Sequence, residues 1–463
     1  MNGFARNWPA SYIVVATLAA ACPSGVVEAQ AIGPEVVRTV GRDEVPESAF
    51  ATRNALKVPG RPIGFNQSLP YSSMERALLG PFRPKLDIQK LPIRFTLSPN
   101  ITLTAAKWEA FSYVTRSREK ILTWSAPVRL TIADFKGQRV IDGRGRFVFS
   151  EEQTWGQVDT SEGNYVVVPT VKGFQAALAL ETAGFPPDHP AKLEDRRKAK
   201  LRGTETRILE EGSFDCATTE NPRFAGVRLT LGIVFTRAAL EAHSKQVFAR
   251  PCAMIHKIVG DINDGLALSE VAVRFRLVGS GLIKGYSEPQ LDGTRAIAHV
   301  LPEIRDTGSD VGKEIDSWRR KRGANIVVVL VSADDGCGIS DDRVERFEDK
   351  ERAIAVADSK CAVFIHSAAH EIGHIMALRH DVRADPSTTP FPYGHGYVFR
   401  GSGHKFLTIM GSRTSCVDCT RANRWSNPAV KENTENRVTG DPKTAHETRV
   451  LEEVAPITAK FFQ

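Results

Sequence analysis

The sequence predicts a β-rich N-terminal region followed by an α/β (α+β) domain with a mixed, twisted sheet. Three observations support this fold class. Short β-type runs separated by Gly, Asp and Asn turns fill residues 92–180. From about residue 224, strand-like and helix-like patterns alternate. One segment, 366–381, carries four of the eleven histidines in a helical pattern.

Composition narrows the class of protein. A chain of 463 residues can form more than one domain, and its 42% hydrophobic and 25% charged residues are typical of globular proteins. The net charge is +7, but no stripe of Lys and Arg alternates with aromatic residues, so we expect no nucleic-acid partner. Beyond the N-terminus no apolar run is long enough for a transmembrane segment.

Residues 1–29 have the pattern of a signal peptide, so we expect a secreted, extracellular or periplasmic protein. Arg6 gives the N-terminal segment a positive charge, residues 12–21 form an apolar stretch too short to span a bilayer, and Val27–Ala29 offers a cleavage site. The alternative is a lipid anchor at Cys22, although the leucine usual three residues before such a cysteine is absent.

Residues 30–222 are expected to form the β-rich N-terminal region. Prolines punctuate residues 30–90, which predicts extended or loop structure there, before the β-type runs of 92–180. Residues 188–212 are dense in charge and suggest a solvated helix or linker. Arg196-Arg197-Lys198 could instead be an exposed activation site.

Residues 223–463 are expected to form the second domain. Its apolar runs predict strands in "GVRLTLGIVF", "VAVRFRLVG" and "NIVVVLVSA". Between them, residues 237–266 should be helical with a break near Pro251, and residues 309–321 should form another helix. Strands and helices in this order favour a mixed sheet, which the histidine-rich helix then follows.

The histidine-rich helix has the spacing of a metal site. His370 and His374 are four residues apart, so both imidazoles can reach one ion from the same helix face. Glu371 points about 100° away from His370, which suits a base beside the ion. His380 can join them only if the chain leaves the helix, so we predict a turn near Ala377-Leu378, where glycine would be the easiest residue.

These residues resemble the metzincin zinc endopeptidases, whose helix pattern is HExxHxxGxxH. All four chemical positions match, and Ala377 replaces the glycine. Met410 in "FLTIMGS" resembles the methionine turn of that clan, and "NRWSNPAV" resembles the reprolysin-like members. Ser412, two residues after the methionine, replaces the tyrosine of astacins and serralysins. The segments "VVVLVSADDGCGIS" and "SKCAVFIHSAAHE" resemble bacterial peptidyl-Asp metallopeptidases.

The resemblance covers about 224–463 and implies a zinc-dependent endopeptidase with a metzincin-like catalytic domain. Three histidine ligands leave one zinc position open for water, and Glu371 would act as its general base. Protein or peptide substrates are implied. The alternative is a non-catalytic binding or adhesion protein that keeps the scaffold. Hydrolysis of a non-peptide bond is a further alternative.

The resemblance also implies that residues 30–222 act as a pro-region that blocks the cleft. Cys216 could then be a thiolate ligand to the zinc, or it could pair with Cys252. Cys337 with Cys361 and Cys416 with Cys419 are the other local pairs that an exported chain could form. Arg413, Arg421 and Arg424 could form a pocket for an acidic substrate residue or be ordinary surface arginines.

Overall fold

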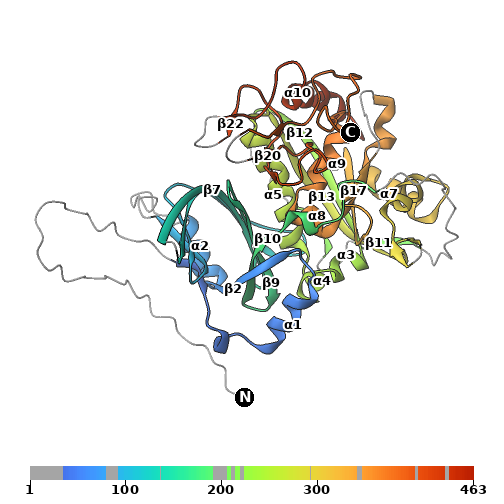
Figure 1. The fold of residues 1–463 in the computed structure, drawn as a ribbon. Coiled ribbons are helices and arrows are strands. Elements are labelled where there is room, and N and C mark those ends of the chain that lie inside the picture. Colours follow the sequence, from blue (N-terminus) through green and yellow to red (C-terminus); the bar gives the residue numbers. More distant parts are fainter. Residues whose placement is uncertain are drawn as a thin grey trace, which may run out of the picture.

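Each half of the chain builds its own sheet in the computed structural model, and the two halves pack side by side (Figure 1). The structure describes residues 35–79, 92–135, 137–190, 206–209, 214–218, 224–243, 245–291, 293–340, 347–401, 405–432 and 437–462. The predicted signal peptide, Cys22 and Arg196-Arg197-Lys198 lie outside these residues. No helix in the described part is long and apolar enough to cross a membrane.

The N-terminal sheet has the strand order β4-β3-β1-β2-β10-β9-β8-β7-β6-β5, and it closes into a barrel because its first strand, β4, also pairs with β6, the last strand but one. Its strands are β1 (Glu35–Thr39), β2 (Gly60–Ser68), β3 (Ile93–Ser98), β4 (Ile101–Ala105), β5 (Glu109–Val114), β6 (Lys120–Asp134), β7 (Gly137–Phe149), β8 (Thr154–Thr160), β9 (Gly163–Val171) and β10 (Phe174–Leu180). The interior contains the contacting rings of Phe95, Trp124 and Phe147. The β-rich prediction for residues 92–180 is therefore confirmed.

Residues 35–79 contain more regular structure than the sequence suggested. Helices α1 (Glu47–Ala55) and α2 (Tyr71–Leu79) and a 3-10 turn, η1 (Arg42–Glu44), accompany β1 and β2. The prolines stand where a missing N–H costs least: Pro46 caps α1, and Pro70 begins α2 by accepting bonds from Ser73 N and Met74 N. Pro46 and Pro70 thus stand at helix starts and Pro62 lies within β2, where loops were predicted.

The second sheet has six strands in the order β11-β13-β12-β16-β18-β17. They are β11 (Arg207–Leu209), β12 (Val227–Thr236), β13 (Val273–Lys284), β16 (Ile326–Val331), β17 (Gly338–Ser340) and β18 (Ile354–Asp358). The central four run parallel, whereas β11 and β17 are antiparallel to their neighbours, so the sheet is mixed as predicted. The antiparallel strand β17 forms the edge beside the histidine-rich helix.

Helices accompany this sheet, and those within residues 237–268, 310–322 and 367–375 lie where helices were predicted. They are α3 (Arg237–Glu241), α4 (Lys245–Ala249), α5 (Cys252–Leu268), α6 (Ile297–Arg305), α7 (Asp310–Arg322), α8 (Ser359–Phe364), α9 (Ser367–Ile375) and α10 (Glu447–Thr458). Pro251 is the N-cap of α5, so the predicted break falls there. Ser309 caps α7 by accepting from Gly312 N, and Gly323 ends it with φ 60°.

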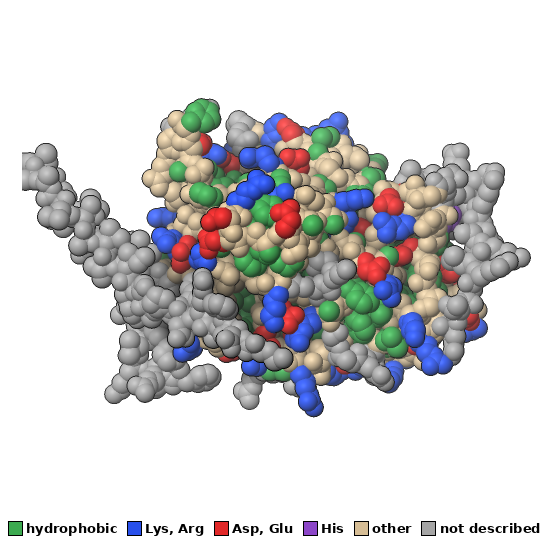
Figure 2. Space-filling view, turned by 90° about the horizontal axis from the view of Figure 1, so that it is seen from below, with side chains coloured by type: hydrophobic (Ala, Val, Ile, Leu, Met, Phe, Trp, Pro, Cys, Tyr) green, Lys and Arg blue, Asp and Glu red, His purple; other side chains and the backbone are tan. Residues whose placement is uncertain are grey.

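Short elements complete the chain around the site. They are η3 (Thr182–Gly184), η5 (Phe347–Arg352), β14 (Gln290–Leu291), β15 (Thr294–Arg295), β19 (Val398–Phe399), β20 (Phe406–Leu407), β21 (Thr420–Arg421), β22 (Lys431–Glu432) and β23 (Arg437–Val438). On the face drawn in Figure 2, the basic and acidic side chains of the described residues are interspersed. The positive net charge is therefore not gathered into one field on that face.

The two halves share one core and one buried ion network. A single cluster of buried apolar side chains includes Trp155 of β8 and Phe364 of α8. Arg146 of β7 bonds Asp159 at 2.5 Å and Asp261 of α5 at 2.9 Å, and Lys257 Nζ lies 2.5 Å from the same Asp261. Breaking such buried pairs is costly because it leaves an uncompensated charge, so the halves are held firmly together.

Candidate metal centre and active site

Helix α9 carries the first two histidines with their side chains buried. His370 Nδ1 lies 2.8 Å from the carbonyl of Ile409, and His374 Nδ1 lies 3.1 Å from that of Leu378. A carbonyl can only accept, so each Nδ1 donates a proton to it. Each Nε2 therefore keeps its lone pair, which is the form of imidazole that binds metals.

The chain leaves α9 at the predicted place. Ala377 has φ 66°, in the left-handed region. Ala377 N donates to His374 O at 3.0 Å and Leu378 N to Gly373 O at 2.9 Å, which closes the helix end. The predicted turn at Ala377-Leu378 is confirmed, and it carries His380 back toward the other two rings.

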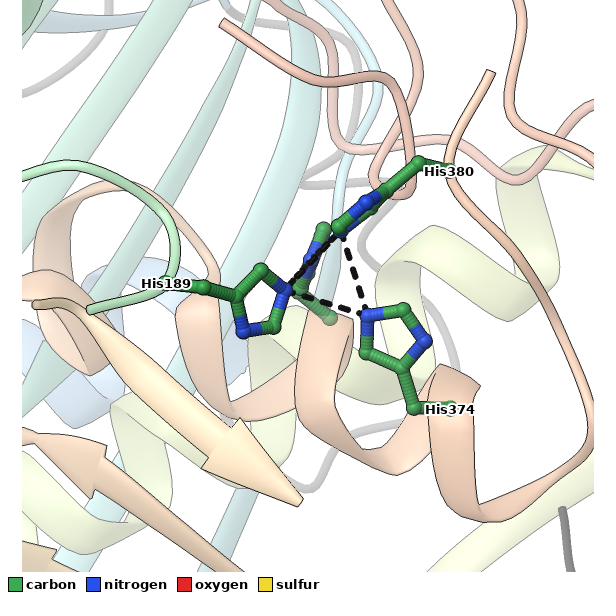
Figure 3. A group of neighbouring side chains, drawn as sticks. His189, His374 and His380 are labelled. Atoms are coloured by element: carbon green, nitrogen blue, oxygen red, sulfur yellow. Dashed lines mark hydrogen bonds between the residues drawn. The ribbon is translucent and has the colours of Figure 1, made fainter. Parts of the chain in front are cut away.

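The three predicted histidines meet at one point, and a fourth joins them (Figure 3). His380 Nε2 lies 3.1 Å from His370 Nε2 and 3.2 Å from His374 Nε2. His189 Nε2 lies 3.2 Å from His370 Nε2, 2.9 Å from His380 Nε2 and 3.2 Å from His374 Nε2. His189 comes from the loop that follows η3 in the N-terminal half.

The four nitrogens fit a tetrahedral divalent metal. Zinc–nitrogen bonds of about 2.0–2.1 Å place the corners of a tetrahedron roughly 3.4 Å apart, close to the spacings among these atoms. Burial lowers the pKa of His374 to about 3 and of His189 to about 4, and it lowers the pKa of His370 well below its ordinary value. Neutral rings with converging lone pairs repel one another unless a cation lies between them, so the donor set suits a metal.

Glu371 lies beside the cluster, fully buried. Its Oε2 accepts a hydrogen bond of 2.8 Å from Ser340 Oγ of β17, and its Oε1 lies 3.9 Å from His189 Nδ1. Gly338 leaves room for this carboxylate, because a Cβ there would lie 2.3 Å from Glu371 Oε1. The carboxylate is thus held between the edge strand and the histidines.

Met410 lies beneath the histidine helix in a tight turn that Gly411 N closes on Thr408 O at 2.9 Å. Its side chain is fully buried, and a Cβ at Gly373 would lie 2.4 Å from its sulfur. Asp381, next to His380, accepts from Ser412 N at 2.9 Å. The turn and the third histidine are therefore tied together.

The cysteines form disulfides in all the described positions. Cys216 pairs with Cys252, Cys337 with Cys361, and Cys416 with Cys419. Cys216 is therefore no thiolate ligand to the histidine centre, which corrects that expectation. The reason is topological: the paired sulfur of Cys216 is buried against α5, whereas the loop after η3 reaches the centre with an imidazole.

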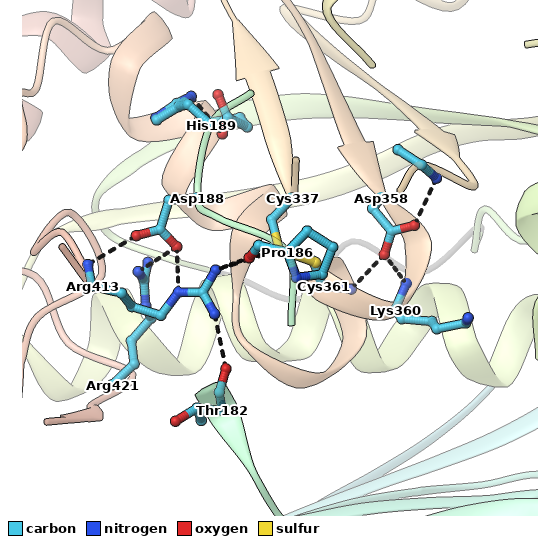
Figure 4. The surroundings of a disulfide bond; sticks show 12 residues. Thr182, Pro186, Asp188, His189, Cys337, Asp358, Lys360, Cys361, Arg413 and Arg421 are labelled. Carbon is cyan, nitrogen blue, oxygen red and sulfur yellow. Dashed lines mark hydrogen bonds and ion pairs between the residues drawn. A yellow bond between two sulfur atoms is a disulfide. The ribbon is translucent and has the colours of Figure 1, made fainter. Parts of the chain in front are cut away.

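The loop at residues 186–190 is the part of the site that sequence reasoning missed (Figure 4). Cys337 N donates to Pro187 O at 2.8 Å, and Gly338 N donates to Asp188 O at 3.0 Å, so the loop lies along the edge strand β17. No spacing rule links His189 to a helix 181 residues later. The one available signal was a histidine beside an aspartate between prolines in a predicted pro-region.

The predicted arginines separate into two groups. Arg413 and Arg421 both bind Asp188, at 2.9 Å each, so they are not ordinary surface side chains. Arg424 instead donates to Leu268 O at 2.5 Å.

Comparisons with known proteins agree with this site. Residues 252–381 match the model of the metallo-peptidase family M12B, reprolysin-like. A peptidyl-Asp metalloendopeptidase of Stenotrophomonas maltophilia is 27% identical over 306 residues, which are 66% of this chain and 68% of the relative. One from Xanthomonas campestris pv. campestris is 27% identical over 288 residues, 62% of each chain. One from Pseudomonas fragi is 44% identical over 71 residues, 15% of this chain and 46% of the relative.

Among solved structures, metalloproteinase-II from Bacteroides fragilis aligns with 63% of this chain and with 82% of its own chain, at 10% sequence identity. The TM-score of 0.35 is too low for this alignment to bear on the fold. The family match contains α8, α9 and the third histidine, and the sequence similarity to the relatives covers about two thirds of the chain. Together with the histidine centre, these matches support a metalloendopeptidase similar to the reprolysin-like family.

Proposed function

We propose that the protein is an exported, zinc-dependent endopeptidase in which His370, His374 and His380 hold the metal. The observation that carries this proposal is the convergence of their Nε2 atoms at tetrahedral spacing with each α9 ring's Nδ1 bonded to a carbonyl. Three disulfides among the described residues support an oxidising location. The names of the relatives support peptide substrates that contain aspartate.

The chemistry divides between the metal and Glu371. Bound zinc supplies a Lewis acid that polarises the peptide carbonyl and lowers the pKa of water toward about 7. The Glu371 carboxylate takes a proton from the attacking water and returns it to the leaving nitrogen. Ser340 holds one carboxylate oxygen at 2.8 Å and thereby orients the other. The buried wall formed by Met410 beneath α9 keeps the two helix histidines in position.

The N-terminal half acts as a pro-region in this proposal, and the form described here is the latent one. Catalytic zinc sites keep one coordination position open, whereas four protein ligands make a closed site. His189 supplies the fourth nitrogen. Removal of the loop that carries it would therefore open the position that a water or a substrate needs.

Hydrolysis and metal content test the proposed function together. The full chain is digested with trypsin until the segment that carries His189 has been removed, and the product is then assayed on casein with trypsin inhibited. We expect activity that a zinc chelator removes. Glu371→Gln should lower the rate about a thousandfold, which is within the range of general-base effects, and should keep one zinc per chain.

The matched control is Glu452→Gln, an exposed carboxylate of α10, which should behave as the wild type. A wild-type chain that binds zinc but leaves casein intact after processing would favour the binding or adhesion alternative. A Glu371→Gln variant with full activity would remove Glu371 from the mechanism.

A further inference from the structure

The side chain of Asp188 occupies a pocket lined by two arginines beside the histidine centre (Figure 4). Asp188 Oδ1 accepts from Arg413 Nε and from Arg421 Nη2, both at 2.9 Å, and its Oδ2 accepts from the backbone N of Arg413 at 3.0 Å. The side chains of Asp188 and Arg421 are only 8% and 3% exposed. This is a charge-assisted, nearly dry carboxylate site.

The Arg421 side of the pocket is held within the catalytic half by bonds that do not involve Asp188, whereas Arg413 also donates to Thr182 O of the N-terminal half. Arg421, at the end of β21, donates from Nη1 to Ile409 O at 2.6 Å and from Nη2 to Gly411 O at 3.2 Å. These carbonyls flank Met410, so the guanidinium is anchored to the turn beneath the histidines. Its Nη1 also lies 3.2 Å from His370 Nδ1, which sets the pocket directly beside the metal centre.

An anion is required in this pocket for an electrostatic reason. Arg413 and Arg421 both form ion pairs with the buried Asp188 carboxylate at 2.9 Å. If Asp188 leaves with the N-terminal segment, a buried guanidinium loses its charged partner. Leaving one member of a buried pair unpaired costs several kcal/mol, so another carboxylate should bind in its place.

The path of the loop shows where that carboxylate would lie on a peptide. Carbonyls of Pro187 and Asp188 accept from the edge strand at Cys337 and Gly338, as an added strand does. The next residue, His189, reaches the metal position. A peptide laid along the same edge would present the side chain next to its reacting bond to Arg413 and Arg421.

We infer that Arg413 and Arg421 form the pocket that binds the acidic side chain of a substrate next to the scissile bond, and that Asp188 fills this pocket in cis as a substrate mimic. The inference rests on the proposed peptidase function. The backbone N of Arg413 cannot move away as a side chain can, so the depth of the pocket is fixed. The pocket therefore favours aspartate over the longer glutamate. Recognition uses both oxygens of the carboxylate, so asparagine is a poor replacement.

A matched pair of peptides tests the pocket. The peptides differ only in Asp or Asn beside the cleaved bond, and the processed chain is assayed for kcat/KM on each. Hydrogen bonds to charged groups contribute about 1.5–3 kcal/mol, so we expect the wild type to prefer the Asp peptide by about tenfold or more. Arg413→Gln should lower that ratio at least about fivefold through a lower kcat/KM on the Asp peptide, while zinc content stays unchanged.

The control is Arg400→Gln, an exposed arginine whose loss should leave the ratio as in the wild type. A ratio near one in the wild type, or an unchanged ratio in Arg413→Gln, would overturn the inference. Casein hydrolysis is measured in the same preparations. Loss of casein hydrolysis in the wild type would refute the proposed function itself, which is a different result from lost preference.

A second measurement does not depend on catalysis. In the unprocessed chain, Asp188→Asn removes the charge that the arginines hold but keeps the size of the side chain. We expect faster hydrogen exchange at the amides of Cys337 and Gly338, which donate to the loop, by at least about tenfold. Unchanged exchange at these amides would show that the arginines do not hold the loop. It would overturn the inference that Asp188 mimics a substrate side chain.

Discussion

At the scale of single residues, Ala377 shows how a departure from a pattern is accommodated. Its φ of 66° lies in the left-handed region, where alanine costs about 1–2 kcal/mol relative to the right-handed region. Two backbone bonds closing α9 and the meeting of His380 with the other rings hold it there. The glycine of the family pattern is thus helpful for the turn and not necessary for it.

Substitutions at Ala377 should separate the effect of backbone strain on stability from the effect of side-chain packing. Ala377→Gly relieves the strain but loses a buried methyl group and adds freedom to the unfolded chain, so we expect stability within about 1 kcal/mol of the wild type. Ala377→Val should cost about 2 kcal/mol or more, because β-branched residues rarely adopt positive φ. Urea unfolding of the full chain measures both, and a valine variant as stable as the wild type would contradict the strain argument.

At the scale of elements, α10 is joined to the segment that follows the methionine turn. Glu447, its first residue, is buried, and its Oε2 accepts from Ser426 N at 2.5 Å. Glu447 N donates back to Ser426 Oγ at 2.9 Å, and that hydroxyl donates to His395 O at 2.8 Å. Ser426 belongs to the "RWSNP" segment on which the reprolysin-like resemblance partly rested. The reciprocal bonds hold that segment against the start of α10.

The burial of Glu447 predicts a pH dependence of stability. Burial raises the pKa of Glu447 to about 8, although bonds from Ser426 oppose the shift. The folded state then binds more protons than the unfolded state between the ordinary glutamate pKa and about 8, so this group's contribution to stability falls as pH rises through that window.

Glu447→Gln should remove this contribution. We expect the variant to gain about 1–3 kcal/mol relative to the wild type between pH 5.5 and 8.5, at about 1.4 kcal/mol per pKa unit as an upper limit. Urea unfolding at several pH values measures the difference, with the exposed Glu452→Gln as the control. A difference that does not change with pH would show that Glu447 titrates normally in the folded chain.

At the scale of the whole molecule, the N-terminal barrel and the catalytic half form one unit that meets at the metal centre. The shared core and the Arg146–Asp261 pair hold the halves together. The loop after η3 then delivers Asp188 and His189 to the centre. Cutting the linker alone would leave these contacts in place, so we expect a cut to activate the protein only if His189 also leaves the centre.

His189→Ala should release part of the activity without any cut, although Asp188 still fills its pocket. The three remaining histidines can still hold zinc, and the fourth position becomes available to solvent. We expect the unprocessed variant to bind one zinc per chain and to hydrolyse casein at least about tenfold faster than the unprocessed wild type. His299→Ala, which lies on α6, is the control. A zinc-loaded His189→Ala chain that stays as inactive as the wild type would show that His189 does not maintain latency.

The sequence by itself determined the parts of this site that depend on local spacing. The four-residue separation of His370 and His374, the required turn at Ala377 and the neighbouring strands follow from helix and strand geometry over short distances. The tertiary structure alone decided that Cys216 is used in a disulfide and that Asp188 and His189 reach the centre. Those contacts join segments far apart in the chain, and only the packing of the barrel against α5 brings them together, so no local pattern could contain them.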